Sequence, residues 1–206
     1  MPKEREMKTF TTVAQLAEEI SKRRQEGDVN VIGIDGKDGS GKSWLAAALA
    51  ETQAADVISL DDYLERNQGG YTRYLDITAI NQKLSRTGRP VILEGVCLLA
   101  AAELIGIDID IRIYVKRMSP YGTWRDEEEC DPALPPEELI AERNKELEEF
   151  AKFEAILDYE NGAEKEETAD GDFSLPKLEK ELIRYHAQYR PASNADCVFE
   201  RSEDES

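Results

Sequence analysis

The stretch VIGIDGKDGSGKSWLAAAL, residues 31–49, joins an apolar run to a glycine-rich loop and then to a helical pattern. Its central part, residues 36–43, has the form G-x-x-x-x-G-K-S, which is the motif of a phosphate-binding loop. The β-branched run at 29–34 predicts a buried strand, and the Ala- and Leu-rich run at 44–54 predicts a helix. The motif requires a strand before it and a helix after it, so its context indicates a phosphate site and not an accidental flexible turn.

The residue types of this loop predict how phosphates would be held. Glycine permits positive φ, so successive backbone N–H groups can turn inward, and the following helix adds the positive end of its dipole. We expect Lys42 to reach the β- and γ-phosphates of a nucleotide and the Ser43 hydroxyl to bind Mg²⁺. Asp38 should point outward, because phosphate would repel its carboxylate. The predicted nucleotide-binding residues of the loop are Gly36, Lys37, Asp38, Gly39, Ser40, Gly41, Lys42, Ser43 and Trp44.

Composition limits the classes of partner and the compartment. The chain has 206 residues, enough for a single domain over 1–206, and a net charge of −18. Such an acidic balance argues against a nucleic-acid groove and against an anionic membrane surface, because both require a basic patch. The three cysteines are far apart, and the sequence has neither a signal-peptide pattern nor an apolar run of transmembrane length, so we expect a cytoplasmic protein. Monomer and homodimer both stay open.

The rest of the chain alternates strands with helices. Apolar strands are predicted at 29–34, 56–60, 90–99, 109–117 and 195–200, and further helices at 77–88, 135–159 and 175–189. Strands that are apolar throughout are typical of a parallel sheet covered on both faces. The predicted fold is therefore α/β, a P-loop NTPase fold with a five-stranded parallel sheet, helices on both faces and a helical lid or insert.

Three segments lie outside this repeating pattern. Residues 1–28 predict an N-terminal helix, residues 118–174 a lid with an acidic helical insert, and residues 201–206 a disordered tail. Within the insert, the polar run 160–172 predicts a mobile connection between two helices that carry apolar stripes.

Acidic residues close two of the predicted strands. Asp61 and Asp62 follow the strand at 56–60, and Glu94 interrupts the apolar run at 90–99. Ligands of parallel α/β sheets bind at the carboxyl ends of the strands, so these carboxylates should meet beside the loop. A strand-ending turn remains the alternative for the aspartates, and a structural salt bridge remains the alternative for Glu94.

The segments GIDGKDGSGKS, SLDDYL and VILEGVCLL together resemble the uridine kinase group of phosphate-loop kinases, which also includes nicotinamide riboside kinases, phosphoribulokinases and type I pantothenate kinases. The resemblance covers residues 29–117 and extends to PASNADCVFE within 185–200. It implies a P-loop kinase domain that uses ATP and Mg²⁺ to phosphorylate a small-molecule hydroxyl, with a nucleoside as the default acceptor. It also implies that Asp61 is the general base, that Asp62 supports it or reaches a metal-bound water, that Glu94 holds metal-bound water or substrate, and that Tyr63 lines the acceptor pocket.

The resemblance to this kinase group also implies a lid whose arginines close over the phosphates. Arg117, after the strand at 109–117, and Arg125, just beyond it, are the predicted phosphate contacts, with Arg125 in a catalytic role alongside Asp61 and Lys42. The acidic run DEEECD at 126–131 offers carboxylates that would pair with an arginine instead. The sequence contains no N-K-x-D segment for reading guanine, which argues against a GTPase.

Two other functions compete with this hypothesis. One is a nucleotide-binding regulatory or interaction protein that kept the loop and lost turnover, with the acidic region 118–184 as its partner surface. The other is a kinase of the same architecture that acts on a nucleotide, a sugar or a vitamin. Asp61 and Glu94 favour an enzyme, because a protein that only binds a nucleotide needs neither carboxylate.

Overall fold

A single six-stranded parallel sheet forms the centre of the molecule, with strand order β1-β6-β5-β2-β4-β3. The computed structural model describes residues 7–65, 68, 70–87, 90–160 and 173–202, with the backbone alone for 154–160. The strands are Lys8–Phe10 (β1), Val31–Asp35 (β2), Asp56–Ser59 (β3), Val91–Glu94 (β4), Ile111–Met118 (β5) and Cys197–Ser202 (β6).

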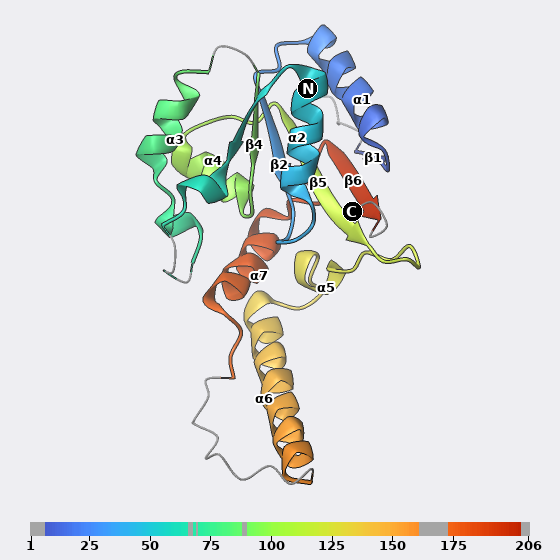
Figure 1. Cartoon of the computed structure of the whole chain (residues 1–206), viewed down its shortest axis with the longest axis vertical. Helices are drawn as coiled ribbons and strands as arrows, with labels where there is room; N and C mark the ends of the chain where they lie inside the picture. The colour runs from blue at the N-terminus through green and yellow to red at the C-terminus, as the bar shows by residue number, and fades with distance from the viewer. Residues whose placement is uncertain (1–6, 66–67, 69, 88–89, 161–172, 203–206) are drawn as a thin grey trace.

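Helices cover both faces of this sheet (Figure 1). Apolar side chains of α1 and α2 pack on one face, and those of α3, α4 and α7 pack on the other. This arrangement confirms the α/β fold with a doubly covered parallel sheet. The helices are α1 (Val13–Glu26), α2 (Lys42–Gln53), α3 (Ile77–Leu84), α4 (Leu98–Ile105), α5 (Glu127–Cys130), α6 (Pro136–Glu160) and α7 (Lys177–Tyr189), with 3₁₀ turns η1 (Leu60–Tyr63) and η2 (Thr72–Tyr74).

The sheet differs from the prediction at three points. It has six strands where five were predicted, because the short β1 pairs with β6 at one edge. The strand predicted at 90–99 ends at Glu94, since Cys97 adopts a left-handed conformation with φ 53° and caps α4, a helix that was not predicted. The last strand continues to Ser202, so residues 201 and 202 of the predicted tail belong to the sheet.

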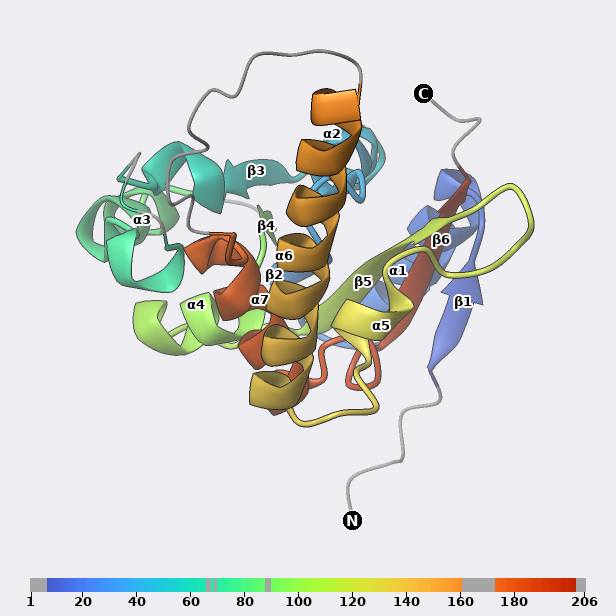
Figure 2. The same ribbon diagram turned by 90° about the horizontal axis from the view of Figure 1, so that it is seen from below.

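The long helix α6 projects away from the sheet, as the two perpendicular views show (Figures 1 and 2). Leu139 and Ile140 in its first turns are buried against Ile183 of α7, whereas Phe150 and Phe153 farther along are exposed. Among the described side chains, up to Phe153, the apolar stripe predicted for this helix is therefore buried at its start and exposed farther along. The connection predicted at 160–172 lies outside the described residues apart from the last residue of α6.

None of the helices among the described residues is both long enough and apolar enough to cross a membrane.

Candidate functional site

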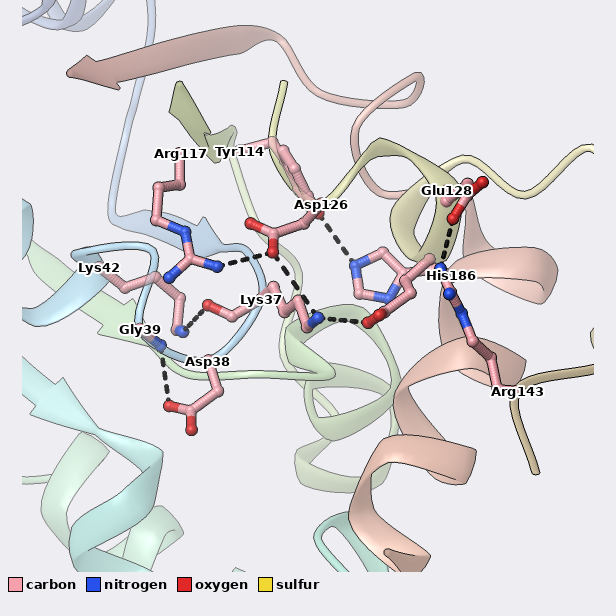
Figure 3. Close-up of polar contacts among 11 residues, drawn as sticks. Lys37, Asp38, Gly39, Lys42, Tyr114, Arg117, Asp126, Glu128, Arg143 and His186 are labelled. Carbon is pink, nitrogen blue, oxygen red and sulfur yellow. Dashed lines mark hydrogen bonds and ion pairs between the residues drawn. The ribbon is translucent and has the colours of Figure 1, made fainter. Parts of the chain in front are cut away.

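The glycine-rich loop connects β2 to α2, and its glycines adopt the positive φ that the sequence predicts. Gly36, Gly39 and Gly41 all have positive φ, at 152°, 71° and 97°. Lys42 is buried, and its Nζ donates to the Lys37 carbonyl oxygen at 2.9 Å, so the ammonium lies across the loop (Figure 3). Ser40 is buried as well, and its hydroxyl has no hydrogen-bond partner among the described residues.

Asp38 lies on the outer side of the loop. It is exposed, and its carboxylate accepts a hydrogen bond from the Gly39 N–H at 2.9 Å (Figure 3). The outward orientation predicted from charge repulsion is therefore observed.

A carboxylate and a hydroxyl meet directly beside the loop. Glu94 ends β4, the neighbour of β2 in the sheet, and is 1% exposed. The Ser43 hydroxyl donates to its Oε1 at 3.1 Å, and its Oε2 has no hydrogen-bond partner among the described residues. A buried carboxylate oxygen without a partner is costly, so this geometry favours a ligand over the structural salt bridge that was the alternative for Glu94.

The two aspartates follow β3, which is the next strand outward from β4. Asp61 and Asp62 are exposed on η1, and Tyr63 is half-buried against the core beside α3 and α4. The Tyr71 hydroxyl donates to Asp61 Oδ1 at 2.5 Å. Because β3, β4 and β2 are consecutive and parallel in the sheet, Asp61, Glu94 and the loop all lie at the carboxyl ends of neighbouring strands. That Asp61 acts together with the loop stays a prediction.

The predicted phosphate contacts Lys37 and Arg117 are held by carboxylates of the α5 region. Arg117 Nη2 donates to Asp126 Oδ1 at 2.8 Å, and the Lys37 ammonium lies 3.6 Å from the same oxygen and forms an ion pair with Glu129 (Figure 3). Arg117 nevertheless lies over the loop, with Nη1 3.7 Å from the position that a Cβ on Gly39 would take. The acidic run 126–131 thus pairs with Lys37 and Arg117, and pairing of this run with an arginine was the alternative that the sequence left open.

Arg125 follows β5 and lies directly before the acidic run 126–131. Its side chain is exposed, and its backbone N–H donates to the Arg117 carbonyl oxygen at 3.0 Å. Its catalytic role therefore stays a prediction.

We expect Glu129→Gln to raise the affinity of the protein for inorganic triphosphate about two- to fivefold, because the Lys37 ammonium would lose a competing carboxylate. Glu128→Gln is the matched control on the same helix, since Glu128 pairs with Arg143 and not with the loop. Isothermal titration calorimetry measures both. Equal affinities for wild type and Glu129→Gln would contradict a competition between phosphate and this carboxylate.

Sequence reasoning missed a further cation beside the loop. Arg201, near the end of β6, lies so close to Gly41 that a Cβ there would sit 2.3 Å from its Nη1. Its guanidinium also lies 5.2 Å from the ring centroid of Trp44, which is 42% exposed. Arg201 fell within the segment predicted to be a disordered tail, so no sequence signal marked it.

Another missed residue, Asp35, is buried directly before the loop. It accepts hydrogen bonds from the Gly36 N–H at 2.7 Å and from the Tyr185 hydroxyl of α7. Burial raises the pKa of Asp35 to about 6, although the Tyr185 hydrogen bond, the Gly36 N–H and Lys42 each oppose the shift. A group whose pKa lies near the physiological range is therefore buried at the end of β2, the strand that leads into the loop.

Protonation of Asp35 should stabilise the folded state. Its folded pKa lies above the ordinary value of 3.8, so this stabilisation is complete below pH 3.8 and is lost as the pH rises through about 6. Relative to Asp35→Asn, the wild-type free energy of unfolding should thus rise by about 2 kcal/mol between pH 7 and pH 4. Urea unfolding of both proteins at the two pH values measures the difference. A difference that does not change with pH would contradict the burial of a titrating Asp35.

The single histidine is part of the core. His186 on α7 is 2% exposed, its Nδ1 lies 2.8 Å from the Leu182 carbonyl oxygen, and its Nε2 lies 3.0 Å from the Tyr114 hydroxyl (Figure 3). A carbonyl only accepts, so Nδ1 carries the proton and Nε2 accepts from Tyr114. Burial lowers the pKa of His186 to about 4, which keeps the ring neutral.

Comparison with known proteins adds a likeness to solved structures. No protein-family model and no curated protein matches the chain. Among solved structures, the chain is similar to a possible uridine kinase from Bacillus stearothermophilus, with 15% sequence identity and a TM-score of 0.48 over 91% of this chain and 96% of that chain. A likeness at this level of identity carries no information about activity.

Proposed function

We propose that this protein is an ATP-dependent kinase that transfers the γ-phosphate to a hydroxyl group of a small molecule. The observation that carries the proposal is the contact between Ser43 of the loop and Glu94, whose second carboxylate oxygen is buried without a partner among the described residues. A nucleotide-binding loop alone needs no such carboxylate. Asp61, on the next strand outward, supplies an exposed acceptor for the proton of the attacking hydroxyl.

In the proposed reaction, Asp61 and Lys42 have separate roles. The acceptor hydroxyl oxygen forms a bond to the γ-phosphorus, the bond between that phosphorus and the bridging oxygen breaks, and its electron pair leaves on ADP. Asp61 takes the hydroxyl proton, and Lys42 turns from the Lys37 carbonyl oxygen to the β- and γ-phosphates. Phosphoryl transfer needs little covalent help, so alignment and charge neutralisation account for most of the rate.

The site also fits Mg²⁺. Ser43 and Glu94 supply a hydroxyl and a carboxylate, which are the oxygen ligands that this ion takes, and Asp62 is exposed on the turn after β3. When bound, the ion would neutralise charge on the β- and γ-phosphates. Mg²⁺ commonly keeps several waters and takes only one or two protein ligands, so Ser43 and Glu94 would suffice to hold it here.

The acceptor is proposed from the sequence resemblance, which favours a nucleoside, with uridine as the default. Nucleotides, sugars and vitamins are the other acceptors that kinases of this architecture use. Release of ADP from ATP and Mg²⁺ should be measured against a panel of all four classes. Acceptor-dependent ADP release with one class supports the proposal, and its absence with every class overturns it.

A nucleotide-binding regulatory protein is the second candidate. The observation that favours it is the pairing of Lys37 and Arg117 with Asp126 and Glu129, which neutralises cations that turnover would use. For this function we expect tight nucleotide binding without acceptor-dependent turnover. Equilibrium dialysis with ATP, run beside the ADP-release panel, separates the two functions.

A further inference from the structure

A hydrogen-bond chain connects helix α7 to the proposed base. Glu181 of α7 accepts from the Tyr71 N–H at 2.7 Å, from the Thr72 N–H at 2.9 Å and from the Thr72 hydroxyl at 2.6 Å. Tyr71 then donates its own hydroxyl to Asp61 Oδ1 at 2.5 Å. A single carboxylate from a distant helix thus fixes the backbone that carries the tyrosine.

The surroundings of Tyr71 leave its hydroxyl little freedom. The residue is 2% exposed, and a Cβ on Gly95 would lie 2.6 Å from the hydroxyl oxygen, so only glycine leaves room for it directly after Glu94. The segment is also tied to η1, because the Asp76 N–H donates to the Tyr63 carbonyl oxygen at 2.9 Å and Leu64 forms an antiparallel bridge with Leu75.

Tyr71 is suited to donate and not to accept at this position. Burial raises the pKa of its phenol far above the ordinary value, and the neighbouring Asp61 carboxylate adds to the shift. The hydroxyl therefore keeps its proton and donates it in a hydrogen bond, for which the Asp61 carboxylate is a suitable acceptor. Asp61 itself is exposed on a short 3₁₀ turn, where a side chain without such a contact would sample several rotamers.

On the premise of the proposed kinase function, we infer that Tyr71 is a positioning residue for the reaction, with Glu181 as its anchor. The tyrosine holds one oxygen of Asp61 and leaves the other, Oδ2, directed to the acceptor hydroxyl. Such preorganisation matters because a small displacement of a catalytic group costs a large factor in rate.

Tyr71→Phe removes only the hydroxyl and tests the inference. We expect kcat to fall roughly tenfold, with the KM for ATP and the melting temperature close to those of wild type, because the loop is untouched. Tyr189→Phe is the matched control: its hydroxyl donates to the Glu103 carboxylate at 2.7 Å, on the surface, and its loss should leave kcat unchanged. Glu181→Gln should lower kcat in the same direction.

The effect should depend on Asp61. In the Asp61→Asn background, Tyr71→Phe should cause almost no further loss of kcat, because the group that it positions is already disabled. A purely structural role for the tyrosine would give the same loss in both backgrounds, and that result overturns the inference.

A measurement without turnover keeps this test separate from the proposed function. In protein with ¹³Cζ-labelled tyrosine, Asp61→Asn should shift the Tyr71 resonance and leave that of Tyr189 in place. An unmoved Tyr71 resonance overturns the inference whatever the activity. A shifted resonance in a protein that phosphorylates no acceptor overturns the proposed function and, with it, the role in positioning, while the hydrogen bond stands.

Discussion

Lys42→Ala is expected to abolish ATP turnover, with kcat lower by about 10² to 10³ and a matching loss of nucleotide affinity. The ammonium of Lys42 lies across the glycine-rich loop, 2.9 Å from the Lys37 carbonyl oxygen, so it is already held at the loop that would bind the phosphates. Alanine would leave the helix N-terminus in place and remove the point charge on the β- and γ-phosphates. Titration of ATP into both proteins, followed by ADP release, measures the two losses.

Lys42→Ala needs a control for the loss of a lysine elsewhere and a check that the variant is folded. Lys83→Ala removes an exposed lysine from the last turn of α3 and should change neither affinity nor turnover. Lys42 is buried, so circular dichroism must establish that Lys42→Ala is folded before its activity is interpreted. A folded Lys42→Ala protein with wild-type affinity and turnover would overturn the assignment of residues 36–43 as a phosphate-binding loop.

Local sequence patterns predicted most of the fold, because short apolar runs and helical periodicity reflect burial directly. They failed where long-range contacts decide the outcome. β1 is three residues long and becomes a strand only by pairing with β6, which lies almost at the other end of the chain. The run after Glu94 is as apolar as a strand, yet a left-handed Cys97 redirects it into α4. Over so few residues, sequence periodicity does not show whether an apolar run forms a strand or a turn that leads into a helix.

The candidate site, too, was predictable only in part. Its motif residues are close in sequence, and strand order then places Asp61 and Glu94 at the same end of the sheet as the loop. The residues that fix their orientation are distant: Glu181 lies 110 positions from Tyr71, and Tyr185 lies 150 positions from Asp35. Glutamate and tyrosine are common on amphipathic helices, and nothing in the sequence indicates which of them makes such a distant contact. Sequence alone therefore could not identify Glu181 and Tyr185.

Asp61→Asn is expected to separate binding from chemistry, which Lys42→Ala does not. Asparagine is nearly isosteric with aspartate, and its carbonyl oxygen can still accept the hydrogen bond from Tyr71 that Asp61 Oδ1 now accepts at 2.5 Å. The amide cannot take the proton of the attacking hydroxyl, so kcat should fall by roughly 10² or more. ATP affinity should stay close to wild type, because Asp61 follows β3 whereas the loop follows β2, two strands away.

Asp62→Asn is the matched variant for this prediction, since the two aspartates are adjacent on η1 and both are exposed. Only Asp61 receives a hydrogen bond from the buried Tyr71, and this contact distinguishes the neighbours. We therefore expect a much smaller loss of kcat for Asp62→Asn. Stopped assays of ADP formation at saturating ATP, with the acceptor identified by the panel, measure both variants. If Asp62→Asn loses turnover and Asp61→Asn keeps it, the general base is Asp62, and the tyrosine contact then serves the fold of the turn and not the transfer of the phosphoryl group.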